Sequence, residues 1–151
     1  MEVDDVPRPC AATSVRRAAR VLSRTYDASL VSSGMNITQF AVMRAVSRHP
    51  DEPLTRVAED LAMDRTSLYR ELTNAQRKKW IKIRKDVDGR SRNAVVTEKG
   101  RKAMAKVDPD WAGIQTRVVD RFGREKWKAF SAEIKRLTEC ADAERAARKG
   151  V

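Results

Sequence analysis

The sequence predicts a mainly α-helical chain that contains one small β-hairpin. Apolar residues recur every three or four positions over most of residues 11–79 and 101–141, which places them on one face of each helix. Between these stretches, at residues 80–97, the period changes to two, as in a strand. A chain of 151 residues is long enough for one continuous domain but not for two large independent ones.

The first helix is expected to follow a mobile tail. Residues 1–10 show no periodicity and are expected to form that tail. Val15 and Leu22 belong to an apolar stripe that runs through residues 11–32, with arginines largely outside it. Gly34 is expected to end this segment, because glycine tolerates the left-handed turn that closes a helix.

Three shorter helices are predicted before the hairpin. The first is expected to begin at Thr38 and the second at Thr55, because each side chain can cap a helix. Asp64 can accept backbone N–H bonds at the start of the third, over about residues 65–79. The second and third helices are separated by very few residues, and this pattern indicates a helix-turn-helix.

A basic hairpin follows directly. Residues 80–84 and 93–97 are dominated by apolar and β-branched side chains, and the segment DVDGRSR between them contains an Asp-Gly turn signal. A hairpin placed directly behind a helix-turn-helix is a wing. The sequence therefore predicts a winged helix-turn-helix lobe over residues 35–100.

Two more amphipathic helices are predicted over residues 101–143. Asp108 and Pro109 are expected to divide this region, with Asp108 as the cap and Pro109 in the first turn of the next helix. Residues 144–151 carry no apolar periodicity and are expected to be a second tail.

The helices at both ends of the chain carry apolar stripes that a winged helix alone is too small to cover. A second copy of the chain is the simplest way to bury them, so residues 11–34 and 101–143 are expected to form a homodimer. The alternative is a three-helix bundle within one chain. The side chains expected at the dimer interface are Val15, Leu22, Trp111, Ile114, Val118, Trp127, Phe130, Ile134 and Leu137.

The charge of the chain points to a polyanionic partner. The net charge is +11, and residues 65–106 alone hold fourteen Lys and Arg against four acidic residues. A field of this size attracts and holds phosphates, so nucleic acid is the leading partner. The alternative is a generic solvated basic face, as on a membrane-surface protein.

Compartment and chemistry are also constrained. The two cysteines, Cys10 and Cys140, have no CxxC partner, so neither a disulfide framework nor a zinc site is expected. The chain has no long apolar run and begins with acidic residues, so we expect a soluble cytoplasmic protein with no membrane partner. His49 is the only histidine and no Gly-rich phosphate loop is present, so we expect no enzyme, no metal and no cofactor.

The helix over residues 65–79 presents a polar face opposite its apolar one. With Leu68, Leu72 and Ala75 on the core face, short polar side chains and arginines stand on the other. Thr66, Ser67 and Arg70 are the expected base readers, because the start of such a helix leads into the major groove. Arg65 and Tyr69 are better placed for the DNA backbone. The expected contact residues on this helix are Arg65, Thr66, Ser67, Tyr69, Arg70, Thr73 and Arg77.

The wing carries the most specific pattern. Asp88-Gly89-Arg90-Ser91-Arg92, then a strand, then Thr97-Glu98-Lys99-Gly100, resembles the MarR family signature, in which an Asp-x-Arg wing is followed by Leu-Thr-x-x-Gly. Val96 stands where leucine is usual. The resemblance extends in helix order over roughly residues 11–141.

This resemblance implies a winged helix-turn-helix regulator of transcription that binds double-stranded DNA as a homodimer at a pseudo-palindromic operator. It implies that Arg90 enters the minor groove or grips its phosphates, and that Asp88 holds the wing and the neighbouring arginine in place. Arg92 is expected to bind DNA as well, because the hairpin pattern makes Arg90 and Arg92 its outermost cations. It also implies a ligand- or stress-responsive repressor with a pocket for a small aromatic or anionic effector.

The resemblance also raises a redox role for Cys10. Some relatives sense oxidants with a cysteine near the first helix, and nearby arginines are expected to lower the pKa of Cys10. An unreactive tail cysteine is the alternative.

Two other functions remain open at this point. A charge-driven architectural protein would bind duplex DNA without sequence preference, and competition with unrelated duplex separates it from a specific regulator. RNA binding ranks behind both, because the sequence predicts no aromatic-rich stacking sheet.

Overall fold

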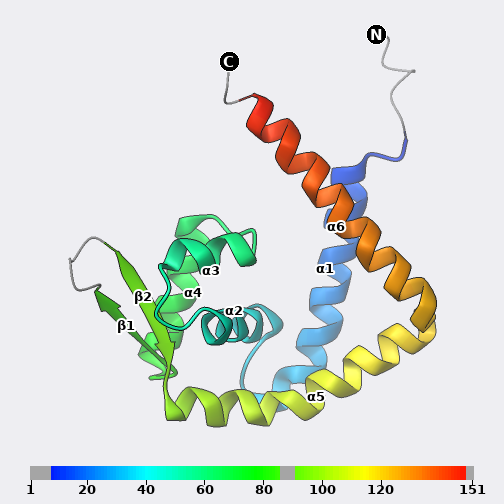
Figure 1. The fold of residues 1–151 in the computed structure, drawn as a ribbon. Coiled ribbons are helices and arrows are strands. Elements are labelled where there is room, and N and C mark those ends of the chain that lie inside the picture. The colour runs from blue at the N-terminus through cyan, green and yellow to red at the C-terminus, as the bar shows by residue number, and fades with distance from the viewer. Residues whose placement is uncertain (1–7, 86–90, 149–151) are drawn as a thin grey trace. The chain divides into compact units, whose positions relative to one another are not determined.

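The computed structural model describes residues 8–85 and 91–148 (Figure 1). These residues form helices and a single antiparallel hairpin, which confirms the predicted fold class. The elements follow one another as α1 (Ala11–Leu30), a 3₁₀ turn η2 (Val31–Ser33), α2 (Ile37–Arg48), α3 (Leu54–Asp60), α4 (Arg65–Arg77), β1 (Ile81–Lys85), β2 (Arg92–Val96), α5 (Glu98–Phe122) and α6 (Arg124–Ala147).

The chain divides into two compact units, residues 1–111 and residues 112–151, and the division falls within α5. In the first unit α2 is central, because it packs against α1, α3, α4 and β2. Phe40, Leu68, Leu72 and Ile81 are among the fully buried side chains of this core. The helix-turn-helix and the hairpin therefore share one core.

Two helix starts differ from those expected. Asn36, not Thr38, caps α2: its side chain accepts the N–H of Gln39 at 2.8 Å, and the Gln39 side chain accepts the N–H of Asn36 in return. This reciprocal pair satisfies two backbone donors together, which a single threonine does not. α3 begins at Leu54 after Pro53, and Thr55 lies in its first turn, because a proline's fixed φ suits the entry to a helix.

Two further expectations fail in the C-terminal half. α5 runs unbroken through Pro109, because Val107 is buried in the core and Trp111 packs against it, so packing on either side outweighs the helix break. α6 extends to Ala147, into the segment expected to be a tail, where Arg145 pairs with Asp142 at 3.0 Å.

The end of α1 and the hairpin follow the sequence closely. Gly34 has a φ of 75° and closes the helical segment, as expected. β1 lies one residue later than the predicted 80–84 and β2 one residue earlier than the predicted 93–97, with Ile81 opposite Val96 and Lys85 opposite Arg92.

The hairpin base is fixed to the start of α5. The hydroxyl of Thr97 donates to the carbonyl of Lys79 at 2.7 Å and accepts the N–H of Gly100 at 3.0 Å. A Cβ at position 100 would collide with the backbone oxygen of Trp80. Only glycine lets α5 approach the hairpin this closely, which gives a physical reason for the Thr-x-x-Gly pattern.

Candidate nucleic-acid interface

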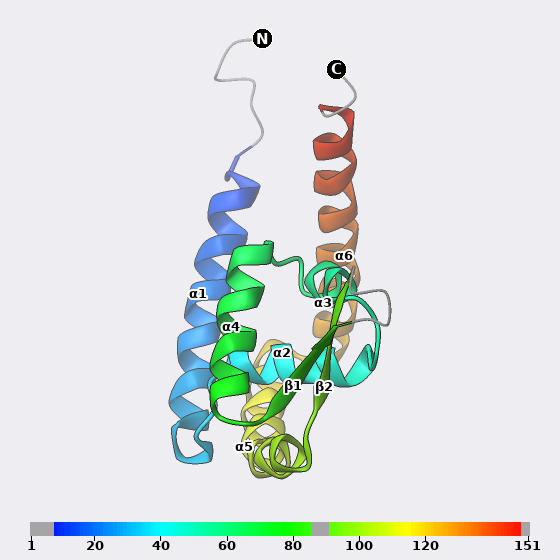
Figure 2. The same ribbon diagram turned by 90° about the vertical axis from the view of Figure 1, so that its left-hand side faces the viewer.

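α4 exposes the polar face that the sequence predicted. Leu68, Leu72 and Ala75 are buried in the core. On the opposite side the exposed residues are Arg65, Thr66, Arg70, Thr73 and Arg77. α4 and the hairpin lie on the same side of their unit (Figure 2), so one surface carries both elements.

The start of α4 is fixed by Asp64. Its carboxylate accepts the backbone N–H of Ser67 at 2.9 Å and the Ser67 hydroxyl at 2.7 Å. These two hydrogen bonds, the hydroxyl's first, hold the pKa of Asp64 below its ordinary value. The hydroxyl proton of Ser67 is thus directed to the cap, while the Thr66 side chain beside it stays exposed.

Within residues 8–85 and 91–148, the arginines of α4 keep most of their donors free. Arg70 lies with its Nε 3.5 Å from Oε1 of Glu71, and its side chain is 72% exposed. Arg77 donates one bond from Nη2 to Oδ1 of Asn74 at 3.3 Å. A guanidinium with several uncommitted N–H groups can still form a bidentate contact with guanine or with a phosphate.

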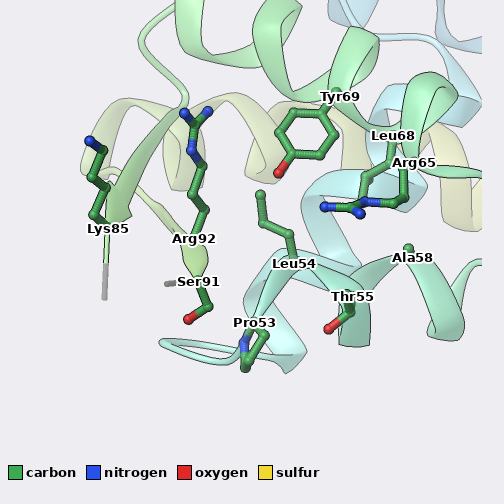
Figure 3. A pocket seen from close by; sticks show the side chains of 10 residues that line it. All are labelled: Pro53, Leu54, Thr55, Ala58, Arg65, Leu68, Tyr69, Lys85, Ser91 and Arg92. Carbon is green, nitrogen blue, oxygen red and sulfur yellow. The ribbon is translucent and has the colours of Figure 1, made fainter. Parts of the chain in front are cut away.

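A cleft lies between α4 and the hairpin, and the start of α3 lines it as well (Figure 3). It has a volume of about 490 Å³ and includes Arg65 and Tyr69 from α4. Lys85 and Arg92 line it from the hairpin. Lys85 was not among the residues singled out from the sequence, although its place in the basic run of the first strand was a usable signal.

The hairpin is also tied to the loop between α2 and α3. Nη1 of Arg84 lies 3.8 Å from Oδ1 of Asp51, and the side-chain amide of Asn93 donates to the carbonyl of Asp51 at 3.4 Å. Asp88 and Arg90, the predicted centre of the wing, lie outside the described residues. Their roles stay predictions.

The expected dimer residues fall into two groups. Some are exposed in the single chain, as the prediction requires: Val15, Leu22, Phe130, Ile134 and Leu137. Val118 and Trp127 are half-buried, and Ile114 is buried. Trp111 packs within its own unit against Phe40, with ring centroids 6.0 Å apart.

Phe122 is also an exposed apolar residue, although the periodic spacing did not place it at the interface. Its ring lies 5.6 Å from that of Phe130, centroid to centroid. The ring of the half-buried Trp127 also lies beside that of Phe130, with the two centroids 6.4 Å apart. These rings form an aromatic cluster at the junction of α5 and α6.

Cys10 is exposed at the start of α1. Its pKa is lowered, as expected, but by hydrogen bonds from the backbone and the side chain of Thr13 and not by the neighbouring arginines. The helix start therefore replaces the arginines as the cause.

His49 lies between two carboxylates. Its Nδ1 lies 3.2 Å from Glu52 and its Nε2 lies 3.2 Å from Asp60, which also binds Arg48. Within residues 8–85 and 91–148 no group of histidine, cysteine or acidic side chains could hold a metal ion. In the same residues, no helix has the length and apolar character that a membrane crossing requires.

Comparisons with known proteins place this geometry in a family. No protein-family model and no curated sequence matches the chain. Among solved structures, the M. tuberculosis transcriptional regulator MosR, in a complex with DNA, is 32% identical, with 89% of this chain and 98% of that chain covered and a TM-score of 0.82.

Two more distant structures share the fold. A MarR family transcription regulator is 20% identical, with 89% of this chain and 91% of that one covered and a TM-score of 0.71. PcaV from Streptomyces coelicolor, solved with its natural ligand, is 18% identical, with 90% and 99% covered and a TM-score of 0.73. With the identity to MosR, the exposed α4 and the adjoining hairpin, the chain belongs to the MarR family of winged-helix transcription regulators.

Proposed function

We propose that this chain acts as a homodimeric repressor that binds double-stranded DNA at a pseudo-palindromic operator. The observation that carries the proposal is α4, whose buried Leu68 and Leu72 hold Thr66 and Arg70 outward on a rigid helix. Hydroxyls and guanidinium groups on such a helix are the groups that read base edges in the major groove. MosR, solved with DNA, supports the same use of the fold.

Selection of bound fragments from genomic DNA tests this function. A specific regulator recovers sites with two related half-sites about 10 bp apart, centre to centre, because each chain of a dimer presents one α4. Unrelated duplex should then compete poorly. An architectural protein bound by charge alone would recover no common sequence, and unrelated duplex would compete as well as any recovered site.

Dimer formation is proposed from the exposed apolar residues of α1 and α6. Phe130, Ile134 and Leu137 follow one face of α6 and are 36–47% exposed in the single chain. Ile134→Asp should lower stability and DNA affinity together, because folding and association are coupled in such dimers. Lys128→Asp, on the opposite face of α6, is the matched control. Light scattering that gives a monomer of 17.1 kDa at micromolar concentration contradicts the dimer.

A small aromatic or anionic effector is proposed to control DNA binding, and PcaV with its natural ligand supports it. In this chain the Arg44 guanidinium lies 4.7 Å from the centre of the Trp111 ring and 5.6 Å from that of Phe40. A cation beside two rings suits an aromatic anion. Release of DNA by such a compound in the wild type, but not in Arg44→Gln, is the expected result.

The proposed role needs no catalytic chemistry. A repressor works by occupying DNA, so we infer a protein without enzymatic activity that acts in the cytoplasm, where the bacterial chromosome lies. The contacts of His49 support this, because its Nδ1 and its Nε2 each lie 3.2 Å from a carboxylate oxygen.

A further inference from the structure

The cleft between α4 and the hairpin has a cationic rim and an apolar floor. Arg65 and Tyr69 stand on one side and Lys85 and Arg92 on the other, with Leu54 between them (Figure 3). Leu54 and the neighbouring Leu68 are buried. The floor is therefore rigid, and the cations surround it.

The three cations of the rim are not neutralised within the described part of the chain. Arg65, Lys85 and Arg92 form no ion pair there, and the described residues that line the cleft include no carboxylate. The neighbouring Arg84 and Arg101 differ, since they pair with Asp51 and Glu98. Like charges around one cleft repel one another, so an anion placed between them is stabilised by all three.

The position of the cleft identifies that anion. In a winged helix the recognition helix lies in the major groove, and a narrow minor groove attracts the cations of a wing. Adjacent major and minor grooves are separated by one sugar-phosphate strand. A strand that runs between α4 and the hairpin has to pass over the cleft that separates them.

We propose that the cleft seats the sugar-phosphate strand between the two grooves, with Arg65 and Arg92 binding one phosphate from opposite sides. The inference rests on the proposed DNA-binding function and adds the partner of this cleft. Lys85 neutralises the same strand, and the Tyr69 hydroxyl supplies a neutral donor. Leu54 packs against the apolar face of a deoxyribose, which explains an apolar floor beneath a cationic rim.

This contact positions the protein and does not select sequence. A phosphate is the same at every base pair, so the cleft fixes the distance between α4 and the wing on the duplex. Arg92 thus has a different role from the one that the resemblance implies for Arg90.

A methylphosphonate scan coupled to substitutions tests the proposal. Each phosphate of the selected operator is replaced in turn by an uncharged methylphosphonate, and affinity is measured for wild type, Arg65→Gln, Arg92→Gln and Lys106→Gln. In the wild type, one position per half-site should cost about 10-fold, as expected for a charge-assisted hydrogen bond. In Arg65→Gln and Arg92→Gln, the same methylphosphonate should cause little further loss of affinity. Lys106, exposed on α5 outside the cleft, is the control and should leave the loss unchanged.

The salt dependence gives a second readout. Arg65→Gln and Arg92→Gln should each reduce the slope of log affinity against log salt by about one unit, for operator and unrelated duplex alike. Circular dichroism and thermal unfolding confirm that each variant is folded.

The outcomes separate this inference from the function on which it rests. If the protein binds DNA sequence-specifically but neither arginine couples to any phosphate, the proposed role of the cleft is overturned and the DNA-binding function stands. A different result is that benzoate binds the wild type and fails to bind Arg92→Gln while neither arginine couples to a phosphate. That result assigns the cleft to a small anion and overturns its proposed contact with the DNA strand. If no duplex is preferred over a scrambled one, the proposed function falls, and the inference falls with it if Arg65→Gln and Arg92→Gln also leave the salt slope unchanged.

Discussion

The Asp64 carboxylate receives two hydrogen bonds from Ser67, one from its backbone N–H at 2.9 Å and one from its hydroxyl at 2.7 Å. This pair sets the residue at which α4 begins. It therefore also sets where Thr66 and Arg70 stand relative to the surface that meets DNA.

Replacing Asp64 tests that dependence. Asp64→Ala should lower the melting temperature by about 2 to 4 °C, the usual result of losing one helix cap in a chain of this size. DNA affinity should fall as well, because the first turn of α4 is no longer held. Asp64→Asn keeps an acceptor for the same N–H and should retain most of both properties. Equal DNA affinity in Asp64→Ala and wild type would show that DNA recognition does not depend on the Asp64 cap.

Arg70 is expected to read a base. Arg70→Ala should weaken operator binding by about 1 to 3 kcal/mol and relax the preference at one base position, if its free guanidinium forms a bidentate contact. Competition with operators mutated at each position measures this. Lys106→Ala, exposed on α5 outside the cleft, is the control for general surface effects. A uniform loss across all sequences would make Arg70 a phosphate contact.

Arg90 and Asp88 test the predicted wing. Arg90→Ala should lower DNA affinity and reduce the salt slope by about one unit. Asp88→Ala removes a negative charge, so it should tighten binding if charge alone governs the wing. If Asp88 positions Arg90, its loss weakens binding instead. Titrations of both variants at several salt concentrations separate these results. Unchanged affinity in Arg90→Ala would show that Arg90 of the wing does not contribute to DNA binding.

Gly100 should be among the least replaceable residues of the lobe. Gly100→Ala places a Cβ against the backbone oxygen of Trp80, and overpacking of this kind costs about 1 to 3 kcal/mol. Gly113→Ala, in the same helix, meets only the flexible end of Arg117 and should be neutral or stabilising by up to about 1 kcal/mol. Urea denaturation compares the two, and equal stabilities would show that α5 can move away from the hairpin.

Asp60 should make stability depend on acid pH. Its hydrogen bonds, first from Arg48 at 2.7 Å and then from His49, hold the pKa of Asp60 below its ordinary value. A lowered folded-state pKa stabilises the fold above the unfolded value of about 3.9, and this contribution disappears as pH falls through the folded value. Asp60→Asn should thus be less stable than wild type near neutral pH, and the difference should vanish once the pH has fallen below the folded-state pKa of Asp60. Asp108→Asn is the control, and a gap that persists in acid would mean that the ion pair with Arg48 is not its source.

The sequence predicts this fold well wherever one periodic signal dominates. Leu68, Leu72 and Ala75 fall on one face of a single helix, so their burial and the exposure of Arg70 follow from spacing alone. The Asp-Gly signal and the change of period locate the hairpin to within one residue.

Local rules fail where distant contacts decide. Pro109 reads as a helix break, yet buried Val107 and the packing of Trp111 carry α5 past it. Asn36 was missed as a cap because its partner Gln39 matters as much as the cap itself.

Part of the candidate site also lies beyond sequence reasoning. Lys85 and Arg65 are far apart along the chain, and only the fold brings them to one cleft. Spacing on one helix shows which side chains face outward, but it does not show which side chains of another element stand opposite.

Recognition of a DNA sequence by this dimer is measured by the ratio of two affinities. A selected operator and a scrambled duplex of the same length and composition are titrated with the wild-type protein at one physiological salt concentration. We expect sequence recognition to give at least about 1,000-fold tighter binding to the operator, the lower end of the range for specific regulators. Equal affinities for the two duplexes would contradict it, because charge alone would then explain all the binding.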